Sequence, residues 1–125
     1  MTLLTRQRSD APDVMAPDGS EVRILAASTR GSMAQFTLPP GAVSKAVAHH
    51  TVEEVWLVTH GTGRMWRKLL DLEVTVDLRP GISIAIPVGA HFQFRNDGAE
   101  PLHCVGVTMP PWPGPDEAYD VEGVW

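Results

Sequence analysis

Cysteine, aromatic residues and surplus positive charge are all scarce in this sequence. Aromatic residues make up 6% of its 125 positions, and Cys104 is the single cysteine. A lone cysteine excludes a disulfide within the chain, as is usual in a reducing compartment, and its place before an apolar segment predicts a buried thiol. Lys and Arg number 10 against 15 Asp and Glu, and the net charge of -5 argues against a nucleic-acid partner, since no surplus cations can displace phosphate counterions.

Long hydrophobic runs are missing as well. No apolar stretch approaches the ~20 residues that a membrane-spanning helix requires. The first ten residues also lack the apolar segment of a secretory signal. With 43% hydrophobic and 20% charged residues, the composition is that of a globular protein. We therefore expect one soluble cytoplasmic domain with no membrane partner.

Glycine and proline, by contrast, are frequent and separate short apolar stretches. There are 11 of each, which leaves no room for long helices. Between them, apolar residues recur at every second position, as in Leu72, Val74, Val76 and Leu78, which is the period of a half-buried strand. The same reasoning predicts strands near residues 22–26, 33–38, 55–58, 82–86, 92–95 and 105–109. The apolar run at 55–58 further predicts a central strand buried on both faces. Short strands with regular turn signals predict an all-β sandwich or barrel.

The two ends of the chain differ from this strand-rich middle. Residues 1–20 predict a loose N-terminal arm, residues 21–110 the barrel and residues 111–125 a C-terminal tail. Four prolines between residues 110 and 115 make the tail stiff and extended. Because the tail carries Trp112 and Trp125, we expect it to pack on the barrel or on a partner subunit, and we predict a homodimer.

Two segments in the middle of the chain combine glycine, histidine and glutamate or proline at fixed spacings. In the first, Gly41 precedes a His pair, then Glu54, then Gly61 after six further residues. In the second, Gly81 is followed by Pro87-Val-Gly89, a histidine and an asparagine. These two segments resemble the conserved motifs of the cupins. The resemblance implies an antiparallel jelly-roll barrel, the double-stranded β-helix of that family.

The resemblance also implies a divalent metal inside the barrel, held in the family by two His and a Glu of the first motif and a His of the second. Glu54 matches the family's glutamate, and either His49 or His50 matches its second histidine, depending on whether the gap to Glu54 is four residues or three. We predict metal ligands among the residues that match or adjoin these positions: His49, His50, Glu54 and His91. A mixed set of imidazole and carboxylate suits Fe, Mn, Ni, Cu or Zn.

The predicted metal site departs from the family pattern at two positions. The first histidine of the pair falls on Val47 or Ala48, and the histidine of the second motif falls on Phe92, one residue after His91. Since strand side chains alternate between faces, this offset turns His91 away from the cavity unless a bulge restores it. Glu54 is the most secure member and the candidate catalytic residue.

Two functions follow from the resemblance. The first is a metal-dependent enzyme of oxygenase, isomerase or lyase type that acts on a small organic molecule. The second is a cupin without metal or turnover that binds a small molecule. In either case we expect aromatic side chains to line the cavity: Trp56, Trp66, Phe92 and Phe94.

Overall fold

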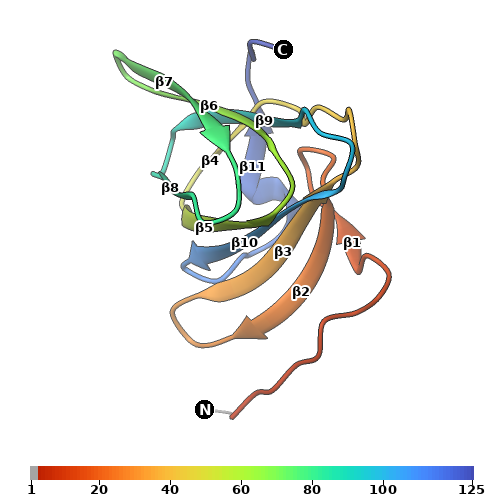
Figure 1. Cartoon of the computed structure of the whole chain (residues 1–125). Helices are drawn as coiled ribbons and strands as arrows, with labels where there is room; N and C mark the ends of the chain where they lie inside the picture. Colours follow the sequence, from red (N-terminus) through yellow and green to blue (C-terminus); the bar gives the residue numbers. More distant parts are fainter. Residues whose placement is uncertain (1–2) are drawn as a thin grey trace.

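The computed structural model describes residues 3–125, so the first two residues of the predicted N-terminal arm lie outside it. The chain folds almost entirely into β-strands (Figure 1). The elements are β1 (Val14–Met15), β2 (Glu21–Ala27), β3 (Ser32–Leu38), β4 (Val47–His49), β5 (Glu53–His60), β6 (Gly63–Leu69), β7 (Leu72–Leu78), β8 (Ser83–Ile86), β9 (His91–Asn96), β10 (Leu102–Met109), the 3-10 turn η1 (Pro115–Glu117) and β11 (Ala118–Asp120).

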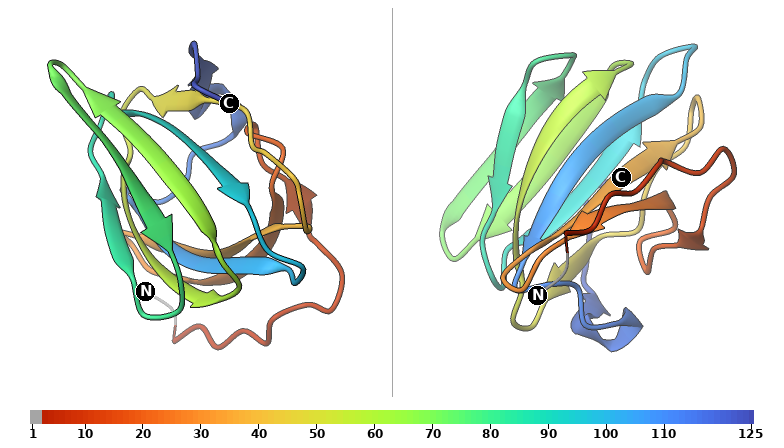
Figure 2. Two further views of the ribbon diagram at one scale, coloured as in Figure 1. Left: turned by 45° about the horizontal axis from the view of Figure 1, so that its top comes forward. Right: turned by 90° about the horizontal axis from the view of Figure 1, so that it is seen from below.

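Two antiparallel sheets form the walls of a barrel (Figure 2). Across the described residues, one sheet has six strands in the order β1-β2-β3-β10-β5-β8. The other has five in the order β11-β4-β9-β6-β7. Neighbours in space are mostly distant in sequence, as in the pairing of β10 with both β3 and β5. The predicted all-β antiparallel jelly roll is confirmed.

The part of the barrel interior between β6, β9, β10 and β5 is filled with side chains. Met65, Phe94 and Leu102 have no exposed surface. Trp56 stacks on Phe36 at 4.8 Å between ring centroids and meets Phe94 edge-on at 5.1 Å. Cys104 is fully buried here, and burial raises the pKa of its thiol to about 12, which confirms the predicted buried cysteine. Close packing of apolar side chains makes this part of the barrel the main source of stability.

Two sequence predictions about strands need correction. β5 does lie inside its sheet, between β10 and β8, but Val55 and Leu57 are each 46% exposed. Only one face of β5 is buried, because the outer face of this sheet has no layer packed on it. In β7, Leu72 is 72% exposed and only Leu78 is fully buried. The β6–β7 hairpin projects beyond the barrel, so its far end has nothing to pack against (Figure 1).

The N-terminal arm runs beside β2 and ends in a short strand. β1 pairs with β2, and the Arg23 guanidinium donates hydrogen bonds to the carbonyls of Ser9 and Asp10. Further along the arm, Asp18 is buried, and its carboxyl group accepts hydrogen bonds from the N–H and hydroxyl of Ser20. This turn brings the arm to the open end of the barrel.

The C-terminal tail packs on its own barrel through β11, which pairs with β4. The Glu117 carboxylate accepts hydrogen bonds from the backbone N–H groups of His50 and Thr51 and from the Thr51 hydroxyl. The pKa of Glu117 lies below its usual value. Burial alone would raise this pKa, but the hydrogen bonds from Thr51 and His50 together have the larger, opposite effect. At the end of the chain, the Gln93 side chain bonds to the backbone of Trp125. The tail thereby closes one side of the barrel.

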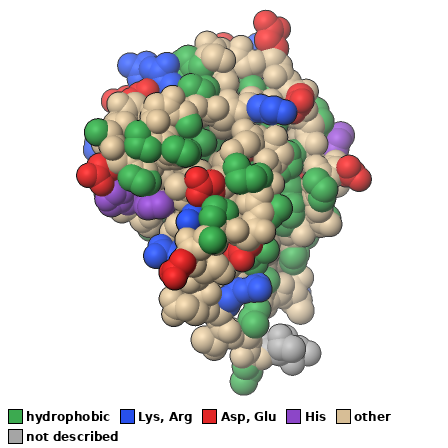
Figure 3. Space-filling view, turned by 90° about the vertical axis from the view of Figure 1, so that its right-hand side faces the viewer, with side chains coloured by type: hydrophobic (Ala, Val, Ile, Leu, Met, Phe, Trp, Pro, Cys, Tyr) green, Lys and Arg blue, Asp and Glu red, His purple; other side chains and the backbone are tan. Residues whose placement is uncertain are grey.

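The surface mixes apolar and charged side chains. Figure 3 shows one side of the molecule, on which hydrophobic side chains lie among acidic and basic ones. Within residues 3–125, no helix is long and apolar enough to cross a membrane.

Candidate functional site

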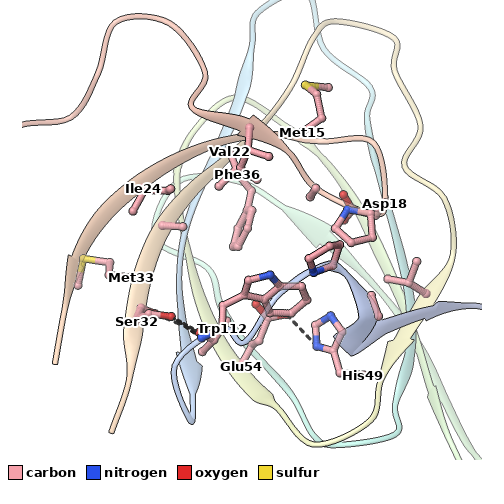
Figure 4. A pocket seen from close by; sticks show the side chains of 18 of the residues that line it. Met15, Asp18, Val22, Ile24, Ser32, Met33, Phe36, His49, Glu54 and Trp112 are labelled. Atoms are coloured by element: carbon pink, nitrogen blue, oxygen red, sulfur yellow. Dashed lines mark hydrogen bonds and ion pairs between the residues drawn. The ribbon is translucent and has the colours of Figure 1, made fainter. Parts of the chain in front are cut away.

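A cavity of about 310 Å³ opens between the two sheets, at the end of the barrel bordered by the arm and the tail (Figure 4). Its lining is mostly aliphatic and aromatic. It comprises Val14, Met15, Ala16, Pro17, Asp18, Val22, Ile24, Ser32, Met33, Ala34, Phe36, Val47, His49, Glu54, Phe92, Thr108, Trp112, Pro115 and Ala118. Apolar cavities of this size with few polar groups are typical sites for small organic molecules.

Glu54 and His49 form a buried polar pair in the wall of this cavity. Glu54 is 3% exposed, His49 is 6% exposed, and 3.5 Å separates the Glu54 Oε2 from the His49 Nδ1. Side chains alternate between the two faces of a strand, so Glu54 points inward and its neighbour Glu53 points outward. Burial raises the pKa of the Glu54 carboxyl to about 8, an effect that the nearby Trp56 indole N–H reduces and the Asp18 carboxyl reinforces. The Trp56 N–H makes no hydrogen bond of good geometry, so its contact with Glu54 is weak.

The His49 imidazole is held between aromatic rings. It meets Phe92 edge-on at 5.3 Å and Trp112 at 5.1 Å between ring centroids. Burial lowers the pKa of His49, against the opposing effect of the Glu117 carboxylate. Its Nδ1 is buried and has no hydrogen-bond partner. Since a buried polar atom without a partner is costly, this nitrogen is a place where a ligand atom would be stabilised.

Asp18 and Trp112 join the site from the two ends of the chain. Asp18 lines the cavity from the arm, and burial raises the pKa of its carboxyl group. Trp112 comes from the tail, where its backbone N–H donates to the Ser32 hydroxyl at 2.9 Å. Its indole lies beside His49, 5.1 Å between ring centroids, and is drawn in front of Glu54 in the view of Figure 4. Sequence reasoning named neither residue as part of the site, although the apolar bulk of Trp112 did indicate that the tail packs.

Of the four predicted metal ligands, the structure brings together His49 and Glu54. His50 turns away from the cavity and packs on Tyr119, 4.4 Å between ring centroids. His91 is half-buried on the opposite face of β9 from Phe92, and no bulge turns it inward. No cluster of three or more His, Cys, Asp or Glu side chains able to hold a metal occurs in the described part of the chain.

The fold and the two motifs agree with a family comparison. The family model that describes the cupin domain matches residues 34–108, which is more than half of the chain. This chain belongs to the cupin family.

Solved structures with the same fold include proteins of different size and role. One is an uncharacterized conserved protein with a double-stranded β-helix domain from Klebsiella pneumoniae, which is 17% identical to this chain. The match covers 95% of this chain and 91% of the Klebsiella chain, with a TM-score of 0.69. The capsular polysaccharide assembling protein CapF from Staphylococcus aureus is 20% identical over 83% of this chain, with a TM-score of 0.70. Oxalate decarboxylase from Bacillus subtilis is also 20% identical, over 82% of this chain, with a TM-score of 0.70. This cupin spans 32% of the CapF chain and 28% of the decarboxylase chain, and the likeness concerns the fold.

The residues of this barrel do not complete the ligand set implied by the cupin motifs. With His49 as the second histidine, the first position is Val47, and the position in the second motif is Phe92. Val47 and Phe92 face each other across β4 and β9 and both line the cavity. Neither side chain can donate to a metal, so two donors remain, His49 and Glu54. Stable metal sites in proteins usually have three or four protein ligands.

The predicted cavity aromatics lie in different parts of the cupin barrel. Phe92 lines the cavity, whereas Trp56 and Phe94 belong to the filled interior behind it. Trp66 is buried against β7, and its indole N–H donates to Glu73 at 2.8 Å. Phe36, which was not predicted, completes the aromatic lining. Strand alternation indicates that a side chain points inward, but it does not tell which part of the interior is hollow.

Proposed function

We propose that this cupin binds a small, mostly apolar organic molecule in the cavity and exchanges a proton with it through His49 and Glu54. The observation that carries this proposal is one imidazole and one carboxyl group, buried side by side in a mostly apolar cavity. The proposed activity is acid–base chemistry, such as isomerisation or elimination, and it requires these two side chains alone.

The two groups are suited to opposite roles. With its pKa raised to about 8, Glu54 carries a proton near neutral pH and is able to donate it. With its pKa lowered, His49 is neutral there, and its unpartnered Nδ1 is able to accept a proton. Pairs whose surroundings push their pKa values apart in this way are characteristic of acid–base sites. Trp112 and Phe92 exclude water from the pair and orient an apolar ligand against it.

A neutral probe tests this proposal without knowledge of the natural substrate. Nitrobenzisoxazole is a small aromatic molecule that opens when a base removes its ring C–H proton; the N–O bond breaks and a coloured phenolate forms. We expect the protein to open this probe about 100-fold faster than its His49→Gln variant, within the usual range for a positioned base. The Glu53→Gln variant changes a carboxylate outside the cavity and should match the parent. Equal rates for the parent and His49→Gln would contradict the proposal.

A divalent transition metal, Fe, Mn, Ni, Cu or Zn, is the second candidate. The observation that favours it is the buried, unpartnered Nδ1 of His49 facing the Glu54 carboxylate. Two protein donors would bind a metal weakly and leave most coordination positions to water or ligand.

Elemental analysis after metal loading separates the two candidates. Stoichiometric metal that is lost in Glu54→Gln, but kept in His60→Ala and His103→Ala, would favour the metal site. We expect no stoichiometric metal, because Val47 and Phe92 occupy the other positions.

A further inference from the structure

The cavity is lined by acidic side chains and a histidine, without the Lys or Arg side chains that usually bind anions. Asp18, His49 and Glu54 are its ionisable lining residues, and neither Lys nor Arg lines it. A carboxylate or phosphate group on a ligand would therefore enter an apolar space without a cation to pair with, and it would face two carboxyl groups. Transfer of an unpaired anion into such surroundings is strongly unfavourable. The cavity therefore disfavours an anionic ligand.

Within residues 3–125, the two carboxyl groups of the cavity have no Lys or Arg as a partner. Asp18 and Glu54 are 6% and 3% exposed. Asp18 accepts hydrogen bonds from Ser20, whereas Glu54 faces the His49 Nδ1 at 3.5 Å without hydrogen-bond geometry. Buried acids are normally paired or hydrogen-bonded, so a cationic group in the cavity would supply what the protein itself does not.

Aromatic rings line the same cavity as this carboxyl group. Phe36, Phe92 and Trp112 all line the cavity together with Glu54, and the Trp112 indole lies 5.1 Å from the ring of His49, which in turn faces Glu54. The face of an aromatic ring attracts an organic cation, most strongly when the pair is shielded from water. An independent feature also calls for a ligand at this place, namely the unpartnered Nδ1 of His49, a side chain that is 6% exposed.

We propose that the ligand of this cavity is an organic ammonium ion, with its charged nitrogen between Glu54 and the Trp112 ring. Glu54, which is protonated in the empty cavity, gives up its proton to solvent when the ammonium ion binds, and Asp18 adds a second carboxyl group nearby. The hydrocarbon part of the ligand packs on the aliphatic lining from β1, β2 and β3. This inference rests on the proposed function, because it names the class of molecule that the same cavity binds.

Three probes of the same shape and different charge test the inference on the unmodified protein. Phenylpropylammonium, phenylpropanol and phenylpropionate are compared by titration calorimetry near neutral pH. We expect the ammonium ion to bind at least about tenfold more tightly than the alcohol, a difference of about 1.4 kcal/mol, and the carboxylate to bind most weakly. Binding of the alcohol or the carboxylate as tightly as the ammonium ion would overturn the inference. In that case the proposed function stands, whereas binding of none of the three probes would contradict both.

A matched pair of variants locates the preference for positive charge. Glu54→Gln keeps the size of the side chain but leaves it unable to ionise beside a bound cation, so the advantage of the ammonium ion over the alcohol should fall to about twofold or less. Glu53→Gln makes the same change on the exposed face of the same strand and should leave the advantage unaltered. Should Glu54→Gln fail to fold, Asp18→Asn provides a second variant, with a smaller reduction expected. An advantage that survives both Glu54→Gln and Asp18→Asn would overturn the assignment.

Discussion

The interior of this barrel has two regions that differ in packing and polarity. Around Met65 and Phe94 it is filled by apolar side chains without exposed surface. Around His49 and Glu54 it is hollow, and buried polar groups lack full sets of partners. Apolar packing stabilises a fold, whereas a cavity with poorly partnered polar groups costs stability. The contrast indicates that the filled region maintains the barrel and that the hollow region is kept for a ligand.

The largest expected effect is in the filled region. Phe94→Ala removes a fully buried ring that contacts Trp56, and we expect the free energy of unfolding to fall by about 3–5 kcal/mol. Trp112→Ala, at the half-buried rim of the cavity, should cost less stability but weaken probe binding more. Urea unfolding and calorimetry on the two variants check this. Equal loss of stability in both would erase the distinction between the regions.

The next largest effect concerns Glu54 and depends on pH. The pKa of Glu54 is about 8 in the folded protein, above its ordinary value of 4.5. Between pH 4.5 and pH 8, therefore, the folded protein keeps the Glu54 proton, whereas the unfolded chain has lost it. The free energy of unfolding therefore falls as pH rises through this window, by up to about 1.4 kcal/mol per pH unit. Glu54→Gln should remove this slope and gain stability relative to the parent between pH 5 and pH 8. Parallel pH profiles for the two proteins would contradict a neutral Glu54.

A smaller effect is expected where the tail meets the barrel. Glu117→Gln weakens the charge-assisted hydrogen bonds to His50 and Thr51, and we expect a loss of about 1–2 kcal/mol. Because the pKa of Glu117 is lowered in the folded protein, its contribution is present above its ordinary pKa and fades as pH falls. Hydrogen exchange should quicken at the Val121 amide, which bonds to Ala46. Exchange at the amide of Phe94 should stay slow.

The neighbouring acid provides the control for this prediction. Asp116 lies beside Glu117 in η1 but is exposed. Asp116→Asn should leave exchange in the tail unchanged. If the two substitutions quicken it equally, the carboxylate of Glu117 does not hold the tail.

The sequence allowed the barrel, and part of its site, to be predicted. The match to the cupin motif put Glu54 inside the barrel, and the structure agrees, with Glu54 buried and its neighbour Glu53 exposed. Alternation left His49 and His50 open, because the choice depends on how β4 meets β11 and the loop before β5. Asp18 and Trp112 could not be assigned to the cavity, since their contacts join segments far apart in sequence. The exposed outer face of β5 was missed because apolar residues on both faces look the same whether or not a layer covers them.

The distinction between the hollow and filled regions can be measured directly through the indole N–H signals of the four tryptophans. Trp112 lines the cavity and Trp56 contacts Glu54, whereas Trp66 bonds to Glu73 and Trp125 lies by Arg95. On titration with phenylpropanol, followed by nitrogen–proton correlation spectra and assigned with Trp→Phe variants, the Trp112 and Trp56 signals should shift to saturation. The signals of Trp66 and Trp125 should stay in place. A probe that shifts Trp66 or Trp125 and leaves Trp112 unchanged would contradict a ligand site at His49 and Glu54.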